Sequence, residues 1–189
     1  GNIGRPDIIL FHPDGSLNVP GTCVRSRDGT ERLSVQDSYD PHSTAFASNR
    51  KQGLGGLGLR SWRITEGPIA VNQGGLEADF VAEATHQGFP GVVCGGILGC
   101  LVESHGNWTA ALAMMDEAKL SAPPLTVTAS FQVDCLKPTP IDRELKLISH
   151  VTEMNSKRAK VVVDIYCDLS RNPESPPALG DSEAERELS

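Results

Sequence analysis

Apolar and polar residues alternate along three stretches of the chain, with the two-residue period of a β-strand that is buried on one face. The stretches are residues 76–85, 125–135 and 159–169. Weaker alternation predicts two further strands, at residues 59–71 and 144–154. Strands of a parallel sheet are normally buried on both faces, so this pattern predicts an antiparallel sheet with one covered face.

Residues 95–118 instead repeat their apolar positions every three or four residues, which is typical of a helix. Such a helix spans roughly 30 Å and is long enough to cross a sheet. Few polar residues interrupt it, so we expect it to be enclosed. Small residues and one carboxylate share a side: Gly95, Gly99, Glu103, Gly106 and Ala110. The order of two strands, one long helix and three strands predicts an α+β fold.

The two ends of the chain differ from its middle. Residues 1–52 carry turn signals and only short apolar runs, which predicts a partly irregular N-terminal extension with room for a hairpin. Residues 53–169 hold the periodic segments and form the predicted domain. Residues 170–189 contain three prolines, five acidic residues and two arginines, which predicts a flexible, solvated tail. This tail carries −3 of the net charge of −7, so the body is only mildly acidic.

Composition excludes several classes of protein. No apolar run approaches the roughly 18 residues of a membrane span, so we expect a soluble chain without a membrane span. The isoelectric point near 5.2 argues against binding of nucleic acid. The five cysteines are widely spaced without a C-x-x-C pair, so neither a disulfide framework nor a zinc site is indicated. A reducing, intracellular compartment is the better interpretation, with no distinction between cytoplasm and organelle.

We expect the catalytic residues in the glycine-rich middle of the chain, where close approach of the backbone is possible. Of the 19 glycines, 13 lie between Gly53 and Gly106. Glu103 is the sharpest candidate, since a carboxylate inside a mostly apolar helix is either paired or used as a general base. The alternative is that Glu103 simply faces water, which is common for glutamate. Gly95 and Gly96 begin the same helix, where free N–H groups favour an oxyanion. Their alternative role is a tight turn into close packing.

Other reactive side chains give weaker signals. Cys94 at the start of the helix is a possible nucleophile, but a free cysteine is more often a small buried apolar residue. His105 lies two residues after Glu103, so on a helix the two side chains point to different sides. Lys157 and Arg158 follow a predicted turn and either are solvated or hold phosphates.

Three segments of the chain form a recognisable set: GLGLR at 56–60, HQGFPGVVCGGILGCLVES at 86–104 and LTVTASFQVDCLKPTPIDRELKL at 125–147. Together they resemble the PaaI-like group of hotdog-fold acyl-CoA thioesterases. The most specific part is the Gly-Phe-Pro-Gly-Val-Val-x-Gly-Gly loop before a helix, with an acidic residue nine positions after x. The resemblance covers about residues 53–169. It implies a hotdog fold, in which a curved antiparallel sheet wraps a long helix, and a homodimer or dimer of dimers with acyl-CoA sites at the interface.

The same resemblance implies roles for particular residues. Glu103 would be the base or nucleophile of a hydrolase, the N–H of Gly95 or Gly96 would hold the oxyanion, and Thr128 would assist the water. The remaining residues would contact substrate: Gln87, Phe89, Val93, Cys94, Lys157 and Arg158. No metal or redox cofactor is implied.

One position departs from the family pattern. The family has histidine immediately before Gly-Gly, where this chain has Cys94. A neutral thiol cannot replace imidazole as a hydrogen-bond partner, so activity depends on whether that histidine shapes the loop or positions the thioester. A thioester hydrolase that uses Glu103 is the first hypothesis, and a non-catalytic hotdog subunit with an assembly or binding role is the alternative. A hydratase would need a paired Asp and His, which the loop lacks.

Overall fold

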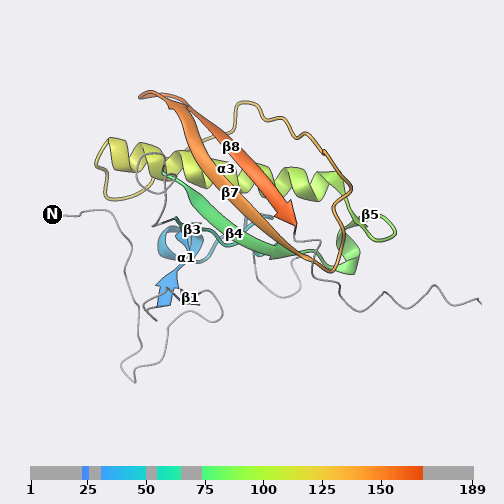
Figure 1. Ribbon diagram of the computed structural model, residues 1–189. Helices are drawn as coiled ribbons and strands as arrows, with labels where there is room; N and C mark the ends of the chain where they lie inside the picture. Colours follow the sequence, from blue (N-terminus) through green and yellow to red (C-terminus); the bar gives the residue numbers. More distant parts are fainter. Residues whose placement is uncertain (1–22, 26–30, 50–54, 65–73, 168–189) are drawn as a thin grey trace, which may run out of the picture.

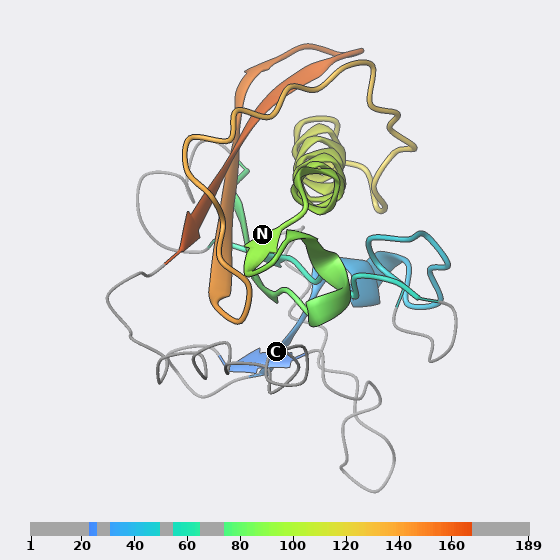
Figure 2. The same ribbon diagram turned by 90° about the vertical axis from the view of Figure 1, so that its right-hand side faces the viewer.

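The computed structural model describes residues 23–25, 31–49, 55–64 and 74–167. At its centre, α3 (Gly95–Glu117) packs against one face of a four-stranded antiparallel sheet of order β3-β4-β7-β8 (Figure 1). A view turned by 90° shows that the sheet curves around the helix (Figure 2). This is the α+β hotdog arrangement that the sequence predicted. The strands of this sheet are β3 (Trp62–Arg63), β4 (Leu76–Val81), β7 (Glu144–Met154) and β8 (Ala159–Cys167).

The remaining elements lie before the long helix. Near the N-terminus, β1 (Cys23–Arg25) and β2 (Glu31–Leu33) pair as a hairpin, and α1 (Val35–Tyr39) follows. After β4, a short 3₁₀ turn η1 (Ala84–His86) leads into the hairpin of β5 (Gln87–Phe89) and β6 (Val92–Val93). Within the described ranges, no helix combines the length and the apolar character needed to cross a membrane.

Two apolar clusters hold the helix against the sheet. In the larger one, Leu98 and Leu101 of α3 lie in the same buried cluster as Leu145 and Leu147 of β7. Burial of such leucine side chains contributes about 1.5–3 kcal/mol each. The second cluster brings the N-terminal helix into the core: Val35, Leu76, Leu112 and Met115.

A line of buried polar residues, here called the polar seam, crosses the interface between α3 and its neighbours. Ser61 Oγ lies 2.8 Å from His105 Nδ1, and His105 Nε2 lies 3.3 Å from the Leu76 carbonyl oxygen. Thr109 Oγ1 donates to the His105 carbonyl at 2.8 Å and lies 2.6 Å from Ser149 Oγ. The seam satisfies polar groups that would be costly to bury alone. Its members are Gln36, Ser61, His105, Thr109 and Ser149.

A buried ion pair ties the N-terminal segment to the same body. Arg60 Nε lies 3.0 Å from Asp37 Oδ1, with both side chains almost fully buried. Arg60 Nη1 also donates to the Ser48 carbonyl at 2.7 Å. Ser34 begins α1 as its N-cap and accepts from the Asp37 N–H at 3.1 Å. Because a buried charge is stable only when paired, this pair fixes α1 and Ser48 against the irregular segment before β3 that carries Arg60.

The predicted strand at residues 125–135 is wrong for this chain. Residues 121–139 form no helix or strand and run back along the length of α3 (Figure 1). A strand needs a hydrogen-bonded neighbour as well as an alternating sequence, and β8 is the edge of the described sheet. The other strands were predicted better. β7 has the predicted bounds, β8 begins as predicted, β4 ends earlier at Val81, and β3 is two residues long.

The small residues that were predicted to share one side of the helix lie in two different environments. A Cβ on Gly99 would lie 3.6 Å from Phe131, whereas a Cβ on Gly106 would lie 3.4 Å from Val163 of β8. Gly106 therefore serves close packing against the sheet, away from Glu103. The prediction that the helix is enclosed is confirmed, because no residue from 97 to 115 is exposed. Residues 1–22 and the tail from 168 onward lie outside the described residues.

The buried histidine makes stability depend on pH. Burial lowers the pKa of His105 from its ordinary value of 6.5 to about 4, although the hydrogen bond to the Leu76 carbonyl opposes this shift. As pH falls, the unfolded chain gains its proton near 6.5 and the folded chain only near 4. The stabilising contribution is therefore complete above pH 6.5 and is lost progressively down to pH 4, by up to about 1.4 kcal/mol per pH unit.

We expect urea unfolding between pH 7.5 and 4 to show this loss for the wild type and for His42→Gln, whose side chain is exposed. In His105→Gln we expect a lower free energy of unfolding at every pH, without the part of its pH dependence that comes from the histidine. Equal slopes for the wild type and His105→Gln would contradict the assignment.

Candidate functional site

A cavity of about 1050 Å³ lies along the side of α3 that faces away from the polar seam. Gly99, Glu103, Asn107 and Ala111 line it at four-residue intervals, so one face of the helix forms its floor. A second wall comes from residues 122–126 with Phe131, and a third comes from the N-terminal segment between residues 39 and 48. The site thus joins three parts of the chain that are distant in sequence.

Glu103 and Thr128 meet at this cavity. Thr128 Oγ1 donates to Glu103 Oε1 at 2.6 Å, and both residues are partly buried. The second carboxylate oxygen of Glu103 has no hydrogen-bond partner among the described residues. A hydroxyl that holds one carboxylate oxygen fixes the side chain and leaves the other oxygen available to a water molecule.

The segment that carries Thr128 shows the opposite orientation to the one its alternation predicted. Thr128 contacts Glu103 while Val127 is 84% exposed, although Phe131 and Val133 further along the segment do line the cavity. The alternation was expected to bury the apolar residues. At Thr128 the polar side faces the helix, because Glu103 there provides a hydrogen-bond acceptor, and Val127 is left exposed among the described residues.

Gly95 and Gly96 also line the cavity, at the beginning of α3. The first backbone hydrogen bond of the helix is donated by Ile97 N to the Cys94 carbonyl at 3.0 Å, so the two glycine N–H groups lie ahead of the hydrogen-bonded turns. The helix rises about 10 Å between Gly96 and Glu103. Since a helical side chain leans toward the N-terminus, this distance suits a carbonyl group and a water molecule between the two groups.

The predicted loop residues are placed outside the cavity. Gln87 uses its side chain to hold the hairpin, because Nε2 donates to the Ala84 carbonyl and Oε1 accepts from the Gly91 N–H. Phe89 is 75% exposed on β5, and Val93 is buried in the main apolar cluster. Cys94 is the N-cap of α3, and its thiol makes no capping hydrogen bond. These residues shape the approach to the helix start and do not line the described cavity.

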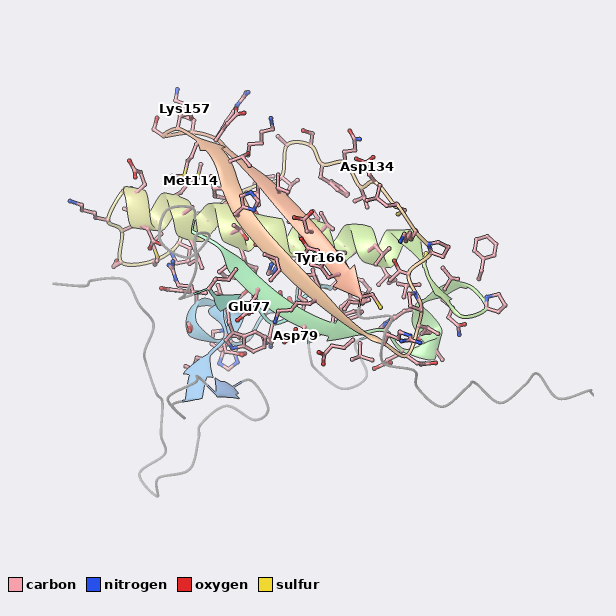
Figure 3. The ribbon with its side chains drawn as sticks, in the orientation of Figure 1. Glu77, Asp79, Met114, Asp134, Lys157 and Tyr166 are labelled. Atoms are coloured by element: carbon pink, nitrogen blue, oxygen red, sulfur yellow. The ribbon has the colours of Figure 1, made fainter. Side chains whose placement is uncertain are left out.

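Lys157 and Arg158 are also distant from the start of α3. Both are exposed in the turn between β7 and β8, where their N–H groups donate to the Asn155 side chain. Lys157 lies at the same end of the molecule as Met114, near the last turns of α3 (Figure 3). Within one chain they therefore cannot neutralise a phosphate bound beside Gly95. In the described residues, no group of three or more His, Cys, Asp or Glu side chains is arranged to hold a metal ion.

The sequence matches no protein-family model, and no curated protein matches it either. A crystal structure of a thioesterase superfamily protein from Shewanella loihica PV-4 is 30% identical over 64% of this chain and 83% of that chain, with a TM-score of 0.43. The chain belongs to the thioesterase superfamily. Another thioesterase superfamily protein is 16% identical over 61% of this chain and 51% of its own, with a TM-score of 0.40. A protein from Helicobacter felis is 15% identical over 50% of this chain and 61% of its own, with a TM-score of 0.41.

For this member of the thioesterase superfamily, sequence reasoning missed two sets of residues around the cavity. Asn107 and Trp108 line it beyond Glu103, and Tyr39 to Ser48 contribute the third wall. Helical spacing alone would have found Asn107, which lies four residues after Glu103. Nothing in the sequence indicated the third wall, because its position depends on the buried pair of Asp37 and Arg60.

The contact between Glu103 and Thr128 predicts energetic coupling. In a double-mutant cycle of Glu103→Ala with Thr128→Val, we expect a coupling free energy of unfolding of about 1 kcal/mol, because the hydrogen bond is charge-assisted and partly buried. The control cycle pairs Glu103→Ala with Ser130→Ala, an exposed hydroxyl on the same segment, and should give a coupling within about 0.3 kcal/mol of zero. Equal coupling in the two cycles, measured by urea unfolding, would show that the contact is not formed in solution.

Proposed function

We propose that this protein hydrolyses thioesters of acyl-CoA or a similar acyl-pantetheine carrier. The observation that carries the proposal is the hydrogen-bonded pair of Glu103 and Thr128 at a cavity that also reaches the start of α3. The cavity thus holds a fixed carboxylate and, at the start of the same helix, free backbone N–H groups, and together these can add water to a polarised carbonyl. Membership of the thioesterase superfamily supports the same class of reaction.

In the proposed reaction, Glu103 accepts a proton from a water molecule while the water oxygen attacks the thioester carbonyl carbon. The N–H of Gly95 or Gly96 stabilises the resulting oxyanion. When the oxyanion collapses, the C–S bond breaks, the proton passes to the leaving sulfur, and the products are a carboxylic acid and a thiol. Thr128 keeps the carboxylate oriented throughout. Direct attack by Glu103 on the carbonyl, followed by hydrolysis of the anhydride, is the second route open to the same geometry.

The catalytic assignment predicts that Glu103→Gln lowers kcat for hydrolysis of acyl-CoA by about 10²- to 10⁴-fold, since the amide cannot accept the proton. The measurement is release of free thiol from a panel of acyl-CoA substrates that ranges from acetyl to long-chain and aromatic acyl groups. Glu117→Gln, at an exposed position on the same helix, is the matched control and should keep the wild-type rate.

Two results would oppose the catalytic assignment. Unchanged hydrolysis by Glu103→Gln would remove Glu103 from the mechanism. No hydrolysis of any substrate by the wild type would favour the non-catalytic hotdog subunit, in which Cys94 replaces the family histidine.

We also propose that two copies of the chain pair through the segment at residues 121–136. Three of its apolar side chains are largely exposed, which is unfavourable unless another surface covers them: Leu125, Val127 and Leu136. Within the described residues this extended segment pairs with no strand, so its backbone offers hydrogen bonds to a second chain. A homodimer that pairs here would cover these three side chains.

The dimer proposal predicts that Val127→Glu shifts the protein toward monomer, because a charge at the centre of an apolar contact loses its hydration. Val81→Glu is the control, since Val81 is 54% exposed on β4, away from this segment. Sedimentation equilibrium or light scattering gives the mass in solution. A monomeric wild type, or a Val127→Glu variant with the wild-type mass, would contradict the pairing.

A further inference from the structure

The N-terminal segment between Tyr39 and Ser48 forms one wall of the cavity that contains Glu103. This segment lies outside the region of resemblance, which begins near residue 53. Phe46 contributes to this wall while 51% of its side chain remains exposed. A large aromatic residue that is half exposed in the same cavity as Glu103 has contact area to offer a ligand.

The wall is held at several points, so it is a built part of the site. The Leu57 N–H donates to the Phe46 carbonyl at 2.9 Å, and the Leu59 N–H donates to the Ala47 carbonyl at 2.8 Å. Arg60 binds the Ser48 carbonyl at 2.7 Å and also forms the buried ion pair with Asp37. These bonds fix the backbone from Phe46 to Ser48 on the body of the protein.

The charges around the cavity limit what can occupy it. Asp40 and Glu103 line it, whereas no lysine, arginine or histidine does so among the described residues. Two carboxylates without a basic residue disfavour the phosphates of a nucleotide. The other large side chains are aromatic or aliphatic: Tyr39, Phe46, Trp108, Leu125 and Phe131. The cavity therefore fits the uncharged acyl part of a thioester better than its phosphorylated carrier.

We propose that the wall from Tyr39 to Ser48 binds the acyl chain and that Phe46 is a specificity-determining residue for its length. This inference rests on the proposed thioester chemistry and identifies the part of the substrate that the cavity holds. With the carbonyl beside Glu103, the chain extends along α3 toward Trp108 and Ala111, over about 12 Å of helix. A short acyl group ends near Glu103, and a longer one packs between Phe46 and the helix face.

The test measures binding without turnover. S-ethyl-, S-hexyl- and S-decyl-CoA are thioethers that lack the carbonyl group, so calorimetry reports affinity alone. For Phe46→Ala we expect S-decyl-CoA to bind about tenfold more weakly and S-ethyl-CoA to bind as it does to the wild type, because only the longer chain reaches the lost aromatic surface. Tyr166→Ala is the matched control. Tyr166 is 57% exposed on the face of the sheet opposite the helix (Figure 3) and should leave all three affinities unchanged.

The outcomes separate this inference from the proposed hydrolysis. An equal loss for all three thioethers, no loss in Phe46→Ala, or no binding of any thioether to the wild type would each overturn the role of Phe46. A wild type that binds S-decyl-CoA through Phe46 but hydrolyses no acyl-CoA would support the acyl site and reject the hydrolase. Thermal melting checks that Phe46→Ala is folded. Phe46→Leu keeps an apolar side chain and should restore part of the affinity for S-decyl-CoA.

Discussion

The hydrogen bonds of His105 beneath α3 set the rotation of this helix against the sheet. Its ring meets Ser61 on one side and the Leu76 carbonyl on the other, and one turn later Thr109 meets Ser149. Each residue turns the helix by about 100°, so any other rotation would bury these polar groups without partners. Glu103 lies two residues earlier, about 200° around the axis, and the same constraint therefore directs it into the cavity. The burial of the imidazole and the position of the Glu103 carboxylate at the cavity are consequences of one helix orientation.

The polar seam also explains why the N-terminal segment belongs to the site. Gln36 accepts from the Ser61 N–H at 2.8 Å, so α1 is joined to the residue that holds His105. The ion pair between Asp37 and Arg60 lies immediately beside this contact in sequence. Loss of either interaction would release the segment that ends at Ser48, together with the third wall of the cavity. The orientation of α3 and the shape of the cavity thus depend on a shared set of buried polar contacts.

Much of the fold was predictable because its elements have local patterns. The bounds of α3 and β7 follow from the spacing of apolar residues, which depends only on each segment itself. The prediction of a strand at residues 125–135 was wrong because alternation indicates an apolar face and does not show whether a partner strand is present. Glu103 was found as an isolated carboxylate on an apolar helix, and Thr128 only through the family resemblance. The seam and the wall at Phe46 were not predictable, since Gln36 and Ser61, or Ser61 and His105, are 25 and 44 residues apart.

The failed strand links the chemistry of the site to the proposed dimer. In an extended segment, neighbouring side chains face opposite ways, so the contact of Thr128 with Glu103 requires Val127 to point outward. A slip of one residue would direct Val127 at the carboxylate and expose Thr128. A second chain that covers Leu125 and Val127 would stabilise the register in which Thr128 holds Glu103. The apolar side chains that the described residues leave uncovered would therefore, in the proposed dimer, help to keep the candidate catalytic carboxylate in place.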